Sequence, residues 1–113
     1  MIHTLNLQPQ PFAMIAEGLK TIELRLFDEK RQTIKEGDTI VFSNTDTGET
    51  LYTTVLRLHR FDTFAALYQA LPLLSCGYTK ETVASAHPSD MEQYYSAEEQ
   101  QRYGVVGIEL SLI

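Results

Sequence analysis

The chain has 113 residues, of which 43% are hydrophobic and 21% charged, and it carries a formal net charge of −6 and a single cysteine, Cys76. This composition fits one globular domain over residues 1–113, excludes an internal disulfide, and argues against broad binding to a nucleic-acid backbone, which calls for a basic surface. Because no apolar run approaches the roughly 20 residues of a membrane span and the N-terminus lacks a signal-peptide pattern, we expect a cytoplasmic monomer or small oligomer without membrane contact.

The chain begins with the pattern of a strand followed by a short helix. Residues Ile2–Leu7 alternate loosely between apolar and polar side chains, and the prolines of QPQP then end the strand because proline lacks the ladder donor. Pro11 suits the first turn of a helix that buries Phe12 and Ile15. Gly18 is a natural residue to end that helix.

A second strand is predicted from Thr21 to Phe27, where the alternation is clean. One face carries three apolar side chains, Ile22, Leu24 and Leu26, and the other carries Thr21, Glu23 and Arg25.

The middle of the chain predicts a hairpin and then a helix. Strands at Thr39–Ser43 and Leu51–His59 bracket the segment TDTGET, in which Gly48 suits the turn. The period then changes to that of a helix that Asp62 could cap and that Pro72 would end. Its apolar positions are Phe64, Leu67, Tyr68 and Leu71.

The last third predicts two short helices and a closing strand. The helices are expected around Thr79–Ala86 and Ser89–Tyr95, and capping-box spacing begins at Ser89 and at Ser96. The terminal run YGVVGIELSLI has the composition of a buried strand. The resulting order, β-α-β-β-β-α-β, favours an α+β fold with a small mixed barrel and helices that close one side.

Three charges stand together in GLKTIELR, which spans Gly18 to Arg25. Alternating charges of this kind are usually the solvated face of a strand. A site is the alternative reading. Lys20 and Glu23 are three apart, so in a regular strand they point to opposite faces and can meet only if Lys20 precedes the strand or lies at a bulge. Five of the nine basic residues cluster nearby, which is compatible with a small cationic site: Lys20, Arg25, Lys30, Arg31 and Lys35.

The pattern Gly18-x-Lys20-x-x-Glu23-x-Arg25 resembles the GxKxxExR signature of ASCH domains, and the tail from Tyr94 to Ile108 is similar to that of many small bacterial members. The resemblance covers essentially the whole chain. It implies a PUA-like barrel of five or six strands with a cleft between the barrel and its helices. In such proteins the motif side chains line the cleft, and the proposed ligands are RNA or modified nucleosides.

The resemblance leaves binding and hydrolysis open. Some ASCH proteins hydrolyse single-stranded RNA, and a short branch deacetylates N4-acetylcytidine with a motif lysine, a threonine and a distant glutamate. That lysine corresponds to Lys20, but the threonine position holds Glu23, and Thr21 is not that position. Our first hypothesis is therefore a module that binds RNA or a modified nucleoside or nucleotide. The alternatives are a small hydrolase, with Lys20 as base or nucleophile beside Glu23, and a regulatory protein-interaction domain.

The remaining candidates each have a structural explanation as well. Tyr95 could stack on a base or pack in the core, and Ser96 could face the cleft or only cap a helix. We expect no cofactor and no metal, because the three histidines lack ligand spacing, and we expect Cys76 to be a buried small residue. The ligand-binding candidates are thus Lys20, Thr21, Glu23, Arg25, Tyr95 and Ser96.

Overall fold

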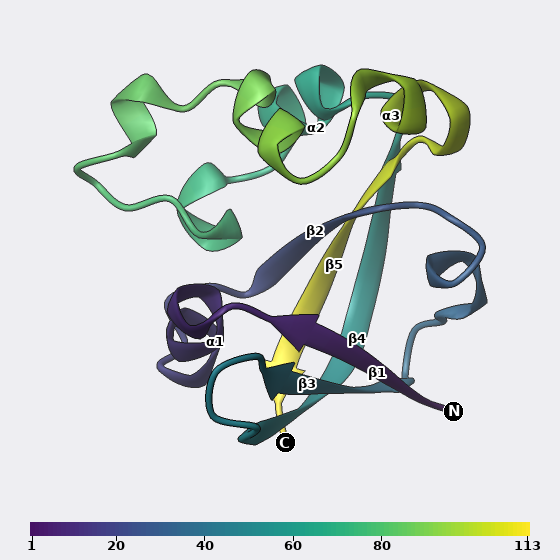
Figure 1. Ribbon diagram of the computed structural model, residues 1–113, viewed down its shortest axis with the longest axis vertical. Helices are drawn as coiled ribbons and strands as arrows, with labels where there is room; N and C mark the ends of the chain where they lie inside the picture. The colour runs from purple at the N-terminus through teal and green to yellow at the C-terminus, as the bar shows by residue number, and fades with distance from the viewer.

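Five strands form one strongly curled sheet in the computed structural model, which describes residues 1–113 (Figure 1). The sheet order is β1-β3-β4-β5-β2, with β1 and β3 parallel and all other neighbours antiparallel. The strands are β1 Ile2–Leu7, β2 Ile22–Leu26, β3 Thr39–Asn44, β4 Thr50–Phe61 and β5 Val105–Leu112. The predicted mixed α+β barrel is confirmed, with five strands that form a half-barrel.

The curl brings the two edge strands, β1 and β2, toward each other. The long strand β4 pairs with both β3 and β5 and changes register between Val55 and Arg57, as at a β-bulge, a feature that increases local twist. Across the open side of the half-barrel, Arg25 Nη2 on β2 donates to the carbonyl oxygen of Asn6 on β1 at 2.7 Å. One arginine side chain therefore links the edges that no backbone ladder joins.

Three helices and four 3₁₀ turns complete the chain. The helices are α1 Pro9–Ala16, α2 Phe64–Ala70 and α3 Ala97–Tyr103, and the turns are η1 Arg31–Thr33, η2 Leu73–Cys76, η3 Val83–Ser85 and η4 Pro88–Gln93. In Figure 1, α2 and α3 lie with the irregular segment between them at one end of the sheet, and α1 lies beside β2 and β3. None of these helices is long and apolar enough to cross a membrane.

The structure corrects several predicted helix ends. Helix α1 begins at Pro9, two residues before Pro11, because proline is tolerated throughout the first turn. Thr63 rather than Asp62 caps α2, since its side chain accepts from the Ala66 N–H at 3.1 Å.

The two helices predicted around Thr79–Ala86 and Ser89–Tyr95 are instead 3₁₀ turns, η3 and η4. The cap of η4 is His87, which forms a capping box with Asp90, and the Ser89 N–H donates to the His87 ring. The capping box predicted at Ser96 is confirmed, with Glu99 as its partner.

Two apolar clusters lie on the two sides of the sheet. The first fills the half-barrel under α1, with Phe12, Phe42 and Ile108 among its members. The second joins β2 and β5 to α2, η2 and η4, through Leu24, Phe64, Leu67, Cys76 and Met91. The apolar residues of β2 belong to the second cluster, whereas Glu23 and Arg25 pair with Ile108 and Val106 of β5 and so share the sheet face of the first cluster.

Candidate functional site

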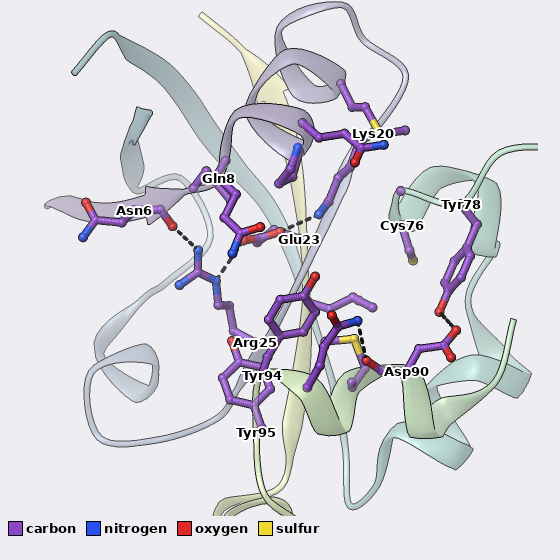
Figure 2. A pocket seen from close by; sticks show the side chains of 18 of the residues that line it. Asn6, Gln8, Lys20, Glu23, Arg25, Cys76, Tyr78, Asp90, Tyr94 and Tyr95 are labelled. Atoms are coloured by element: carbon purple, nitrogen blue, oxygen red, sulfur yellow. Dashed lines mark hydrogen bonds and ion pairs between the residues drawn. The ribbon is translucent and has the colours of Figure 1, made fainter. Parts of the chain in front are cut away.

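Lys20, Glu23 and Arg25 form one ion-paired group on and just before β2 (Figure 2). Lys20 Nζ lies 2.8 Å from Glu23 Oε1, and Arg25 Nε donates to Glu23 Oε2 at 2.8 Å. Lys20 reaches Glu23 because it precedes the strand, which begins at Ile22, so it is free of the strand's alternation. The sequence predicted this condition for their contact.

The turn between α1 and β2 sets the position of Lys20. Gly18 has a φ of 78°, in the left-handed region that favours glycine, and the Lys20 N–H donates back to Met14 O at 3.1 Å. The neighbouring Thr21 N–H then donates to Ser75 O at 2.9 Å. These bonds tie the Lys20 backbone to α1 on one side and to η2 on the other.

Glu23 is buried, with a relative exposure of 4%, so the reading of this strand face as solvated is wrong. Burial alone would raise the pKa of Glu23, but the charges and hydrogen bonds of Lys20 and Arg25 outweigh it and lower the pKa below 4.5. The carboxylate is therefore ionised at neutral pH, with each of its oxygens held by one cation.

The group forms part of the wall of an open pocket of about 430 Å³ between α1, β2 and the segment from η2 to η4. This volume falls within the range of small-molecule sites, roughly 300–1,000 Å³. Lys20 and Arg25 keep donors that bind no protein atom, because Lys20 Nζ gives one bond to Glu23 and Arg25 Nη1 gives none. The pocket therefore has cationic donors available on one wall.

Tyr95 also lines this pocket, together with its neighbour Tyr94. Tyr95 stacks on Phe64, with ring centroids 6.2 Å apart, so one of its faces belongs to the second apolar cluster. Tyr94 is 55% exposed. Figure 2 shows both rings close to Arg25.

Thr21 and Ser96 do not line the pocket. Thr21 is exposed, and its backbone pairs with Ser75 and with Leu110 of β5. The Ser96 hydroxyl accepts from the Glu99 N–H at 3.1 Å as the cap of α3. The structure thus brings together Lys20, Glu23, Arg25 and Tyr95 of the predicted residues.

A second polar group in the pocket was missed from the sequence. Tyr78 donates to Asp90 Oδ2 at 2.7 Å, and Tyr68 and Tyr78 share a hydrogen bond between their hydroxyls at 2.7 Å. Tyr68 occupies the apolar face of its helix, and Asp90 falls in a capping-box pattern, so neither carried a signal for a site. Tyr68 and Asp90 are 22 positions apart, and the chain between them has no regular repeat that would predict that they lie close together.

Cys76 also lines the pocket and is buried, as predicted. Burial raises the pKa of its thiol to about 11, which keeps it protonated near neutral pH. A protonated thiol is a poor nucleophile, so Cys76 serves as a small apolar part of the wall.

Comparisons with known proteins agree with this architecture. The family model of the ASCH domain matches residues 5–113. The crystal structure of hypothetical protein PH0355 superimposes with a TM-score of 0.83 at 30% identity, covering 100% of both chains. The solution NMR structure of protein PF0455 from Pyrococcus furiosus gives a TM-score of 0.77 at 28% identity, covering 100% of this chain and 98% of that one.

No curated protein matched the sequence. The structural likeness extends over the whole chain and confirms the PUA-like fold that the motif implied. Because the family model matches nearly the entire sequence, this chain belongs to the ASCH domain family.

Proposed function

We propose that the protein is a binding module that holds one nucleoside or nucleotide, free or within RNA, in the pocket beside β2. The observation that carries this proposal is the Lys20–Glu23–Arg25 group, which presents two cations with unused donors to a pocket of about 430 Å³. Two cations and one carboxylate leave a local net charge of +1 on a protein whose total charge is −6. A phosphate or a carbonyl oxygen is the natural partner for that wall.

The shape of the site favours a short ligand over a long strand. A protein that binds an extended backbone needs a row of basic side chains, since each phosphate contact adds affinity and salt dependence. The pocket instead places its only lysine and only arginine together at Glu23. Tyr94, exposed at the pocket, supplies a ring on which a base could stack.

Glu23 favours binding over hydrolysis. A general base or acid needs a free oxygen and a pKa near the working pH. Both oxygens of Glu23 are engaged at 2.8 Å, and its pKa is lowered. Its role in this proposal is to hold Lys20 and Arg25 in place, and no hydroxyl nucleophile stands at position 23.

The test is isothermal titration of CMP and of a short single-stranded RNA into the wild type and two arginine variants. Arg25→Ala should weaken binding about tenfold or more, because a charge-assisted hydrogen bond contributes about 1.5–3 kcal/mol. Arg57→Ala is the matched control, since Arg57 is an exposed arginine on β4 outside the pocket. Circular dichroism and melting temperature establish that each variant is folded.

Two results separate this proposal from its alternatives. Equal binding by wild type and Arg25→Ala, or no binding by wild type, would refute a ligand site at this wall and leave the protein-interaction reading. Release of acetate from N4-acetylcytidine, or cleavage of labelled RNA, that disappears in Lys20→Ala would establish the hydrolase instead.

A further inference from the structure

The pocket has a second wall, opposite the cations, that offers hydrogen-bond acceptors. Three residues build it: Tyr68 from α2, Tyr78 after η2, and Asp90 within η4. In Figure 2, Tyr78 and Asp90 lie on the far side of the pocket from Arg25. None of these three residues belongs to the GxKxxExR motif.

The geometry fixes the direction of the hydrogen bonds. The single hydroxyl hydrogen of Tyr78 goes to Asp90 Oδ2, so the bond between the two tyrosines must use the hydrogen of Tyr68. The order is Tyr68 O–H to Tyr78 O–H to the Asp90 carboxylate. Both hydroxyl hydrogens are thereby committed within the protein, and the oxygens keep lone pairs for a ligand.

Asp90 retains one oxygen for a ligand. Its Oδ2 accepts from Tyr78 at 2.7 Å and from the His87 N–H at 3.2 Å, whereas Oδ1 accepts no hydrogen bond from the protein. These bonds lower the pKa of Asp90, with the Tyr78 bond as the largest cause, so the group is a carboxylate at neutral pH. Burial, followed by the bonds to Tyr68 and Asp90, raises the pKa of Tyr78 and keeps its hydroxyl protonated.

We propose that this acceptor wall selects the base of the bound nucleotide by an exocyclic amino group, with Asp90 Oδ1 as the accepting atom. An amino group brings only hydrogens to that edge, so it matches a wall whose own hydrogens are committed. A keto oxygen at the same place would face a carboxylate without a donor between them. Cytosine and adenine are therefore preferred over uracil and hypoxanthine.

This inference assigns to Asp90 the recognition that the sequence suggested for Glu23. Glu23 is buried and each of its oxygens already pairs with a cation at 2.8 Å, whereas Asp90 Oδ1 has no protein donor. The pocket as a whole then carries cationic donors at one end and acceptors at the other. That polarity suits a ligand with a phosphate at one end and an amino group at the other.

The inference rests on the proposed function, and the test separates the two. Titration calorimetry compares CMP with UMP, and AMP with IMP; the members of each pair differ in the exocyclic group and in the hydrogen on the adjacent ring nitrogen. The wild type should bind CMP and AMP about tenfold tighter than their keto partners, the value of one well-formed hydrogen bond to a charged group. Asp90→Asn should abolish or invert that preference, because its carbonyl can still accept from Tyr78 while its amide turns a donor toward the ligand.

Two further variants serve as controls for the effect of Asp90→Asn. Glu92→Gln is the matched control, since Glu92 is an exposed carboxylate in the same turn, outside the pocket, and its substitution should leave the CMP to UMP ratio unchanged. Tyr68→Phe removes the outermost acceptor oxygen and leaves Asp90 in place, so it should reduce the ratio without abolishing it.

The outcomes are distinct. Binding of CMP and UMP with equal affinity, both weakened by Arg25→Ala, leaves the proposed function standing and overturns the acceptor wall. Weaker binding of the 2′-deoxy form of CMP, with no preference between CMP and UMP, would indicate that Asp90 binds the ribose. That result would overturn the proposal that Asp90 recognises an amino group. If the wild type binds neither these nucleotides nor the short single-stranded RNA, both proposals fail.

Discussion

Replacing Glu23 with glutamine should destabilise the fold by about 3 kcal/mol, because it leaves two cations side by side without their counter-charge. Removing one partner of a buried ion pair costs about 3–5 kcal/mol. Lys20 and Arg25 side chains are 10% and 13% exposed, so the small access to water places the cost at the low end of that range. For a domain of this size, about 4 °C per kcal/mol predicts a melting temperature lower by about 12 °C.

The assay is urea unfolding followed by circular dichroism, together with thermal melting. Glu109→Gln provides the matched control, since Glu109 lies on the neighbouring strand β5, is 37% exposed and pairs with His59 at 2.9 Å. An ion pair as exposed as this contributes less than about 1 kcal/mol. The two substitutions are chemically identical, so the difference between them isolates the effect of burial.

A double variant tests whether the unpaired cations cause the loss of stability. If unpaired cations account for the loss, Lys20→Met should cost less in Glu23→Gln than in the wild type, with a coupling of about 0.5–3 kcal/mol. The reasoning is refuted if Glu23→Gln and Glu109→Gln lower the free energy of unfolding by the same small amount.

Three further predictions concern the rest of the fold. Hydrogen bonds from the His3 ring and the Lys35 N–H hold the pKa of Asp38 at about 2, below its usual 3.8. The contribution of Asp38 to folding stability is therefore present above pH 3.8 and is lost as the pH falls toward 2. The urea midpoint should drop over that range in the wild type and drop less in Asp38→Asn. Ser96→Ala should lower the free energy of unfolding by about 1 kcal/mol and leave CMP affinity unchanged, whereas weaker binding by a folded variant would return Ser96 to the site. Gly107→Ala should cost about 1–3 kcal/mol, since a Cβ there would lie 2.7 Å from Leu71 Cδ1 and 3.1 Å from Ile22 Cγ2; an equally stable variant contradicts this.

The local features of this protein were accessible from its sequence. Alternation, the turn signal at Gly48 and the apolar run at the end of the chain located β1 to β5 to within a few residues, and the capping box at Ser96 was readable from its spacing with Glu99. The same alternation showed that Lys20 had to precede the strand or lie at a bulge in order to meet Glu23, and in the structure it precedes the strand and contacts Glu23 at 2.8 Å. Such features depend on residues a few positions apart, whose geometry the backbone period sets.

Tertiary structure alone decided the chemistry of the pocket. A period of two separates the two faces of β2, but it does not say that Glu23 is buried between Lys20 and Arg25. The link from Arg25 to Asn6 and the chain from Tyr68 through Tyr78 to Asp90 join residues 10 to 19 positions apart, through turns without a regular repeat. Those contacts depend on the path of the whole chain around the half-barrel, which no local pattern encodes.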